Sequence, residues 1–122
     1  MPLTYQIDPV EGIVTIAGDY ADAASWHALL SAVAGDPLFR PGLCFIRDLR
    51  SSQNPVSVET VVAIIGVVRQ FWSRLGVRRA AIVIGTRTDA PAMVAHALAD
   101  DHDIALRAFT RYDDAVQWLR EG

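Results

Sequence analysis

Residues 57–85 read SVETVVAIIGVVRQFWSRLGVRRAAIVIG, a long helical pattern followed by a short apolar one. From Ser57 to Leu75, apolar residues recur three or four positions apart, which predicts an amphipathic helix with one buried face. Gly76 follows at the position where a helix commonly ends in a left-handed residue. Arg79 to Gly85 is apolar on both faces, as expected for a central strand of a parallel sheet. This helix and strand together predict an α/β fold.

Before this helix and strand, the sequence predicts two strands and another helix. Leu3–Asp8 alternates apolar and polar residues, and Glu11–Ala17 follows after a tight turn, so these two strands are expected to form an antiparallel hairpin. Ala21–Ala34 has apolar residues at helical spacing. Either Asp19 or Asp22 is the N-cap of this helix.

A third strand at Leu43–Leu49 (LCFIRDL) precedes the long helix, and three more elements follow the central strand. These are a helix at Ala90–Asp100, a strand at Ile104–Phe109 and a C-terminal helix that begins at a capping-box pattern, Thr110–Asp113. The order is therefore ββαβαβαβα. Because crossovers between parallel strands are right-handed, this order predicts a five-stranded, mostly parallel mixed sheet with the N-terminal hairpin at its edge. The sequence contains no internal repeat, low-complexity tract or linker, so we expect one domain over residues 1–122.

The composition excludes several kinds of chemistry. The chain has 122 residues, and all 11 of its basic residues are Arg, so mechanisms that need a lysine amine are excluded. Cys44 is the single cysteine, which excludes an intrachain disulfide and a thiolate metal cluster. Its position in an apolar strand predicts a buried, inert thiol. The net charge of −3 argues against binding to nucleic acid.

The sequence carries no signal for export or for membrane insertion. The N-terminus lacks the basic start and the continuous apolar core of a signal peptide. The most apolar stretch, Val61–Val68, is far shorter than the roughly 20 residues that span a bilayer. We therefore expect a cytoplasmic protein without stable membrane insertion.

Polar residues gather in the loops that follow the parallel strands. Ligands bind at the carboxyl ends of such strands because loops and helix N-termini converge there. These loops supply a candidate site for a protein partner or an anion, made of Asp48, Arg50, Ser51, Ser52, Ser57, Thr86 and Arg87. Two structural alternatives stay open, in which Ser57 caps the following helix and Asp48 pairs with Arg47 or Arg50 to hold the loop.

The long helix is more apolar than one buried face requires. Its predicted core stripe consists of Val61, Ile64, Ile65, Val68, Phe71, Trp72 and Leu75. Beyond this stripe, Val62 and Val67 widen the apolar arc around Gly66. The wider arc is consistent with the lining of a ligand pocket, with the interface of a homodimer, or with additional burial in the core.

The residues needed for metal binding or catalysis do not form a recognisable set. The three histidines, His27, His96 and His102, lack the spacing of helix-borne metal sites. A Ser-His-Asp triad would lack the G-x-S-x-G elbow that supports the nucleophile. A phospho-receiver domain has a similar size and element order, but it needs a late lysine that the chain does not have. We expect no metal site, no cofactor and no enzymatic activity.

Several short motifs connect the chain to a known family. They are YQID at 5–8 with GIV at 12–14, PLFRPG at 37–42, DLR at 48–50, and Phe109 with DAVQWL at 114–119. In these motifs the whole chain resembles the SpoIIAA-like branch of the STAS-type (anti-sigma-factor-antagonist-like) domains. The resemblance implies a non-catalytic regulatory module that binds a protein partner.

The resemblance also implies a role for one serine and a second kind of ligand. Sigma-regulatory STAS domains switch partners when a serine at the start of a helix is phosphorylated. Ser57 is the nearest counterpart, with Val56 and Val58 in place of the usual Asp-Ser-Ser-Gly context. The SpoIIAA-like fold is also similar to that of the lipid-carrying CRAL-TRIO domains. This similarity implies the alternative of a carrier or sensor for a small apolar, lipid-like ligand.

Overall fold

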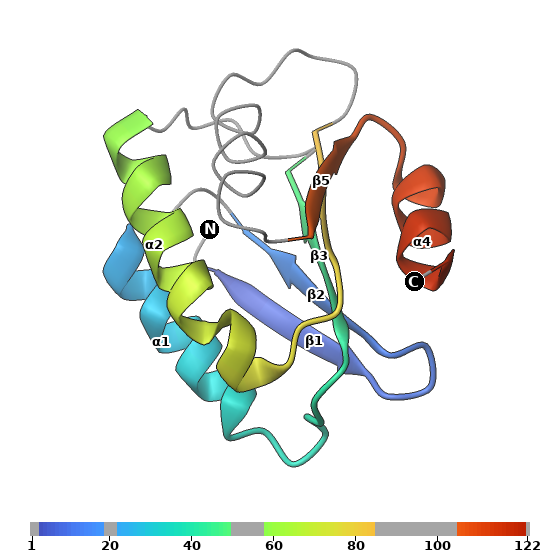
Figure 1. Ribbon diagram of the computed structural model, residues 1–122, viewed down its shortest axis with the longest axis horizontal. Helices are drawn as coiled ribbons and strands as arrows, with labels where there is room; N and C mark the ends of the chain where they lie inside the picture. The colour runs from blue at the N-terminus through green and yellow to red at the C-terminus, as the bar shows by residue number, and fades with distance from the viewer. Residues whose placement is uncertain (1–2, 19–21, 50–57, 85–104, 122) are drawn as a thin grey trace.

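A five-stranded mixed sheet forms the centre of the computed structural model, which describes residues 3–18, 22–49, 58–84 and 105–121 (Figure 1). The strands lie side by side in chain order as β1 (Thr4–Asp8), β2 (Ile13–Ala17), β3 (Cys44–Asp48), β4 (Ala80–Val83) and β5 (Leu106–Phe109). Strand β1 is antiparallel to β2, and every later pair is parallel. The predicted α/β class and the mostly parallel sheet with a hairpin at its edge are confirmed.

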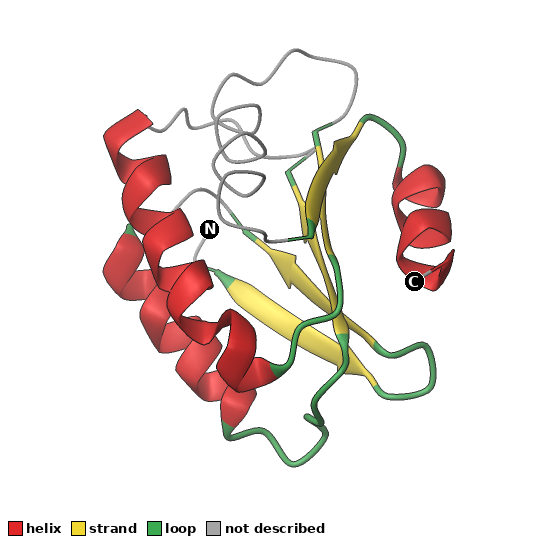
Figure 2. Ribbon diagram, in the orientation of Figure 1, coloured by secondary structure: helices red, strands yellow, loops and turns green. Residues whose placement is uncertain are grey.

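Helices cover both faces of this sheet. Helices α1 (Ala23–Ala34) and α2 (Val58–Leu75) lie together on one face, and α4 (Tyr112–Glu121) lies on the other (Figure 2). We refer to these two sides as the α1–α2 face and the α4 face. The helix predicted at Ala90–Asp100 falls outside the described residues. No helix in the described ranges is long and apolar enough to cross a membrane.

The turn of the hairpin explains why β2 begins at Ile13 and not at the predicted Glu11. The Asp8 carboxylate oxygen Oδ1 accepts hydrogen bonds from the backbone N–H groups of Val10 at 3.0 Å and Glu11 at 3.1 Å. Gly12 then adopts a φ of 73°, a conformation that favours glycine. Its N–H donates to the Asp8 carbonyl at 2.9 Å. These bonds use the backbone of the turn, so the ladder with β1 starts only after it.

Helix α1 begins at Ala23 because Asp22 is its N-cap. The Asp22 Oδ1 accepts a hydrogen bond from the Ser25 N–H at 2.9 Å, which satisfies one of the donors that a helix N-terminus leaves without a partner. This bond lowers the pKa of the Asp22 carboxyl below its ordinary value. Of the two candidate caps, Asp22 takes this role, and Asp19 falls outside the described residues. The helix start predicted at Ala21 is therefore two residues too early.

Helix α2 ends at the glycine that the sequence predicts for this position. Gly76 has a φ of 60°, and its N–H donates to the Ser73 carbonyl at 3.1 Å. The Val77 N–H donates to the Trp72 carbonyl at 3.1 Å, which completes a Schellman motif. A Cβ atom added at Gly76 would lie 3.1 Å from the Pro41 Cβ. Glycine is therefore required here for conformation and for close packing.

Strand β3 divides the core into two parts because its side chains alternate between the faces. Phe45 belongs to the core of the α1–α2 face, whereas Ile46 belongs to the core of the α4 face. Arg47 comes two residues after Phe45 and shares its face. The strand register places Arg47 beside Ile16 of β2 and Ile82 of β4. A charged side chain therefore occupies a central position among apolar neighbours.

Candidate functional site

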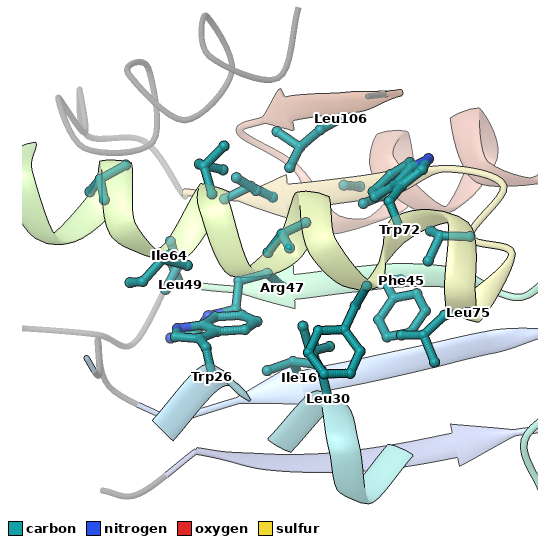
Figure 3. A pocket seen from close by; sticks show the side chains of 18 residues that line it. Ile16, Trp26, Leu30, Phe45, Arg47, Leu49, Ile64, Trp72, Leu75 and Leu106 are labelled. Atoms are coloured by element: carbon teal, nitrogen blue, oxygen red, sulfur yellow. The ribbon is translucent and has the colours of Figure 1, made fainter. Parts of the chain in front are cut away.

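An apolar cavity of about 100 Å³ lies between the sheet and helices α1 and α2 (Figure 3). The strands, their flanking residues and the two helices contribute 18 side chains to its wall. They are Ile16, Trp26, Leu30, Phe45, Arg47, Leu49, Val61, Ile64, Ile65, Val68, Phe71, Trp72, Leu75, Val77, Ala80, Ala81, Ile82 and Leu106. Among these described residues, Arg47 is the one with a charge.

Helix α2 supplies a large part of the wall through the core stripe predicted from the sequence. All seven residues of that stripe line the cavity. Val62 and Val67, which widen the apolar arc, and Gly66 between them do not line it, although all three are described. Val62 and Gly66 are exposed, and Val67 is partly buried against the core cluster. The side of α2 that faces the cavity is therefore its stripe.

Arg47 is the residue of the wall that the sequence reasoning missed. It is 7% exposed, and Figure 3 shows its side chain reaching from β3 toward Trp26 of α1. The guanidinium carbon lies 5.6 Å from the centroid of the Trp26 ring, within the range of a cation–π interaction. The sequence reasoning considered Arg47 only as one of two possible ion-pair partners of Asp48, with Arg50 as the other. The alternation of β3, which puts Arg47 on the face of Phe45, was the signal for its true position.

Trp26 brings a second polar group to the same part of the wall. Its side chain is 8% exposed, and its indole Nε1 is buried. Within the part of the chain that the structure describes, this N–H has no hydrogen-bond acceptor. Both the guanidinium and the indole offer N–H donors and no acceptor. The wall thus combines a hydrocarbon lining with a pair of donors, an arrangement suited to binding an apolar molecule that carries an acceptor.

The polar site predicted at the carboxyl ends of the strands falls mostly outside the described residues. Asp48 is described, at the end of β3, and it is partly exposed. The other six members lie in the ranges that the structure does not describe, namely Arg50, Ser51, Ser52, Ser57, Thr86 and Arg87. This candidate site, including Ser57 as a phosphoacceptor, stays a prediction.

Cys44 is buried, as the sequence predicts, on the α4 face of β3. Its Sγ accepts a hydrogen bond from Arg78 Nη2 at 3.3 Å and lies 3.7 Å from the Leu119 carbonyl oxygen. The same Arg78 Nη2 donates to that carbonyl at 2.9 Å. The thiol therefore lies in the contact between the sheet and α4, on the opposite side of the sheet from the cavity.

The described residues contain no group of three or more His, Cys, Asp and Glu side chains that could hold a metal ion. His27 of α1 packs edge to face with Phe71 of α2, with 5.2 Å between the ring centroids. This contact gives the imidazole a packing role between the two helices. His96 and His102 fall outside the described residues.

In comparisons with known proteins, the chain matches no family model, no curated protein and no solved structure. The resemblance to STAS-type domains therefore rests on the sequence motifs given above. The cavity and its donor pair are the features from which a function is inferred.

Proposed function

We propose that this chain is a non-catalytic regulatory module, as STAS-type domains are, and that it senses a small apolar ligand held between the sheet and helices α1 and α2. The observation that carries the proposal is the apolar cavity of about 100 Å³. Protein interiors pack as densely as organic crystals and contain few voids larger than a water molecule. A void of this size in a chain of 122 residues is therefore a candidate binding site.

The volume sets the size of the ligand. An apolar cavity of about 150 Å³ stays dry and binds benzene, while a water molecule occupies about 30 Å³ of the liquid. The cavity of about 100 Å³ is smaller than the benzene-binding one, so a single ring or a short hydrocarbon chain is the largest ligand to which it is suited. The CRAL-TRIO similarity implies a lipid-like ligand. The volume of the cavity indicates a ligand much smaller than a lipid.

The chemistry of the wall supports binding without catalysis. Nucleophilic and general acid–base catalysis require a hydroxyl, thiol, imidazole, amine or carboxyl group beside the substrate. The described side chains that line the cavity include none of these groups. Outside Arg47 and Trp26, the described side chains of the wall are hydrocarbon except for the Trp72 indole, so burial of apolar surface is the main source of affinity.

Benzene is the probe that tests this proposal, with thermal unfolding as the readout. At a concentration of 100 times Kd, a ligand stabilises the folded state by about 2.7 kcal/mol, which raises the Tm of a domain of this size by about 10 °C. The variant Val61→Phe adds a ring to a buried position of the wall, so we expect it to lose the response to benzene.

The matched control is Val116→Phe, which makes the same change at a partly buried position of α4. This variant retains the response because Val116 packs on the opposite face of the sheet from the cavity. No stabilisation of the wild-type protein by benzene, or equal stabilisation of Val61→Phe, would contradict the proposal.

A second candidate function is self-association through the outer side of α2. Val62 is 48% exposed there, and Gly66, one turn further along the helix, is exposed as well. An apolar side chain beside a glycine allows a second helix to approach closely. Light scattering tests this candidate, since Val62→Glu converts a dimer to a monomer if the face is the interface. A wild-type protein that is already monomeric excludes it.

A further inference from the structure

We propose that the ligand of the cavity is a small carboxylate, either aromatic or short-chain, whose anionic group binds beside Arg47 and Trp26. This inference rests on the proposed function and specifies its ligand class. The juxtaposition that supports it is a buried guanidinium next to a buried indole N–H, in a wall whose other side chains are hydrocarbon except for the Trp72 indole. An amphiphile with an oxygen acceptor at one end matches both parts of this wall.

Arg47 provides the charge that selects an anion. Arg47 lies between Ile16 and Ile82 in the register of the sheet, and its side chain lines the wall at a position where an aliphatic side chain would complete the apolar surface. Arg47 has a further interaction within the protein. A guanidinium carries five N–H donors, so it can bind a ligand oxygen in addition to its other contacts. Away from bulk water, its attraction for a carboxylate is much less screened than at the surface.

Trp26 provides the second reason for an acceptor on the ligand. Its buried Nε1–H lacks an acceptor within the described residues, and a buried donor without a partner is unfavourable. The Arg47 guanidinium lies over the same indole, with its carbon 5.6 Å from the ring centroid. A carboxylate has two oxygens, so one can accept from the indole while the other accepts from the guanidinium. A pure hydrocarbon would leave the indole donor unsatisfied.

The apolar part of the ligand is set by the rest of the wall. Leu49, Val61, Ile65 and Ile82 pack together as one cluster and also line the cavity. The cavity of about 100 Å³ has room for one ring or a short chain beside the donor pair. Benzoate and hexanoate are therefore the probes that represent the two shapes of this ligand class.

The test compares benzoate, hexanoate and benzene by calorimetric titration on three proteins. We expect the better-fitting carboxylate to bind the wild type more tightly than benzene does. The variant Arg47→Met keeps a long side chain and removes the charge, so we expect the ratio of carboxylate affinity to benzene affinity to fall by about tenfold or more. The control Arg107→Met removes another strand arginine whose guanidinium lies over an aromatic ring, 5.7 Å from the Phe109 centroid, and changes neither affinity.

A second measurement needs no substitution at Arg47. The indole N–H proton of Trp26, assigned by its loss in Trp26→Phe, moves downfield when the carboxylate binds and does not when benzene binds. Binding of benzene with no preference for a carboxylate, or an unchanged ratio of carboxylate affinity to benzene affinity in Arg47→Met, overturns this inference and leaves the proposed function standing. Failure of all three probes to bind the wild type overturns both.

Discussion

The two faces of the sheet are packed differently. On the α4 face, the central side chains Ile46, Val83, Ala115 and Leu119 are each at most 1% exposed and form one cluster. On the α1–α2 face, two longer helices enclose the cavity of about 100 Å³ and a buried arginine. Among the described residues, the central side chains under α4 therefore pack against one another, whereas those between the sheet and helices α1 and α2 leave a cavity.

Two arginines just before β4 also hold α4 against the sheet. Arg78 Nη2 donates to the Leu119 carbonyl at 2.9 Å, and Arg79 Nη1 donates to the Trp118 carbonyl at 2.6 Å. These carbonyls belong to the last turn of α4, where helix carbonyls lack partners within the helix. The Arg79 guanidinium also lies 4.7 Å from the centroid of the Trp118 ring. We infer that the α4 face provides stability while the α1–α2 face keeps space for a ligand.

The largest effect is expected from the same leucine truncation made on each face. Leu119 is 1% exposed in the closed core, and Leu30 is 4% exposed beside the cavity. Leu119→Ala should lower the free energy of unfolding by about 4–5 kcal/mol, and Leu30→Ala by about 2–3 kcal/mol, at the two ends of the range for such substitutions. The reason is that Leu30 already lacks neighbours on its cavity side, so its truncation removes fewer contacts. Urea unfolding measures both values.

Equal losses in the free energy of unfolding for the two leucine variants would contradict the difference in packing between the two faces. A larger loss for Leu30→Ala would reverse it, since it would mean that the side chains around the cavity are the more tightly packed ones.

A smaller effect is expected from Arg79→Met, which removes one of the two arginines that donate hydrogen bonds to carbonyls of α4. The substitution deletes a charged hydrogen bond to the Trp118 carbonyl and the contact with the Trp118 ring, so we expect a loss of about 2 kcal/mol in the free energy of unfolding. The control is Arg107→Met, because Arg107 is exposed and its described contact is with the Phe109 ring alone. It should change the free energy of unfolding by about 0.5 kcal/mol or less. Indistinguishable values for the two arginines would show that the carbonyl contacts of Arg79 do not stabilise α4.

Two glycines of the α1–α2 face are expected to respond to alanine with opposite signs. Gly66 lies in the interior of α2, and a Cβ atom there meets nothing within 4 Å, so Gly66→Ala should stabilise the fold by about 0.5–1 kcal/mol through helix propensity. Gly76→Ala should destabilise it, because φ is +60° and the new Cβ would lie 3.1 Å from the Pro41 Cβ. Circular dichroism during urea unfolding measures both changes. Destabilisation by Gly66→Ala would instead indicate that a close neighbour, such as a second copy of the chain, occupies that side of α2.

The smallest effect is a pH dependence that arises at the N-terminus of α1. The hydrogen bond from the Ser25 N–H lowers the pKa of Asp22 in the folded state, so the unfolded chain binds the proton more tightly. The contribution to stability is therefore full above the ordinary aspartate pKa of about 3.9 and is lost as the pH falls through the lower, folded-state pKa. Asp22→Asn keeps a capping side chain and removes this titration. Urea midpoints of wild type and variant should converge as the pH falls from about 7 to about 3. A constant difference between them would exclude a contribution from this carboxylate.

The elements of this fold follow from local patterns in the sequence, whereas the site does not. The stripe of α2, the hairpin and the glycine after α2 each depend on residues close together in the chain, and the structure confirms all three. The choice of Asp22 over Asp19 depends on which carboxylate reaches a particular N–H group, and the spacing alone left both open. The cavity is the space left between side chains of several elements, so no single segment specifies it.

Arg47 also shows why the cavity could not be predicted from the sequence alone. The sequence suggested Arg47 or Arg50 as an ion-pair partner of Asp48, and alternation along β3 places the Arg47 side chain on the face of the cavity. Alternation along a strand predicts the face of the sheet on which a residue lies. Only the packing of helices α1 and α2 shows that a cavity remains between them and this face. A polar residue on an apolar face of a central strand was therefore the strongest available signal of a site.

The central claim is that the cavity on the α1–α2 face binds a small apolar ligand and that the α4 face does not. The most direct measurement is a titration of benzene into the protein followed by methyl NMR. The account predicts shifts in the methyl signals of Ile64, Ile65 and Ile82, which line the cavity, and unchanged signals for Ile46 and Val83 on the α4 face. Unchanged signals on both faces, or shifts of equal size on both, would contradict it.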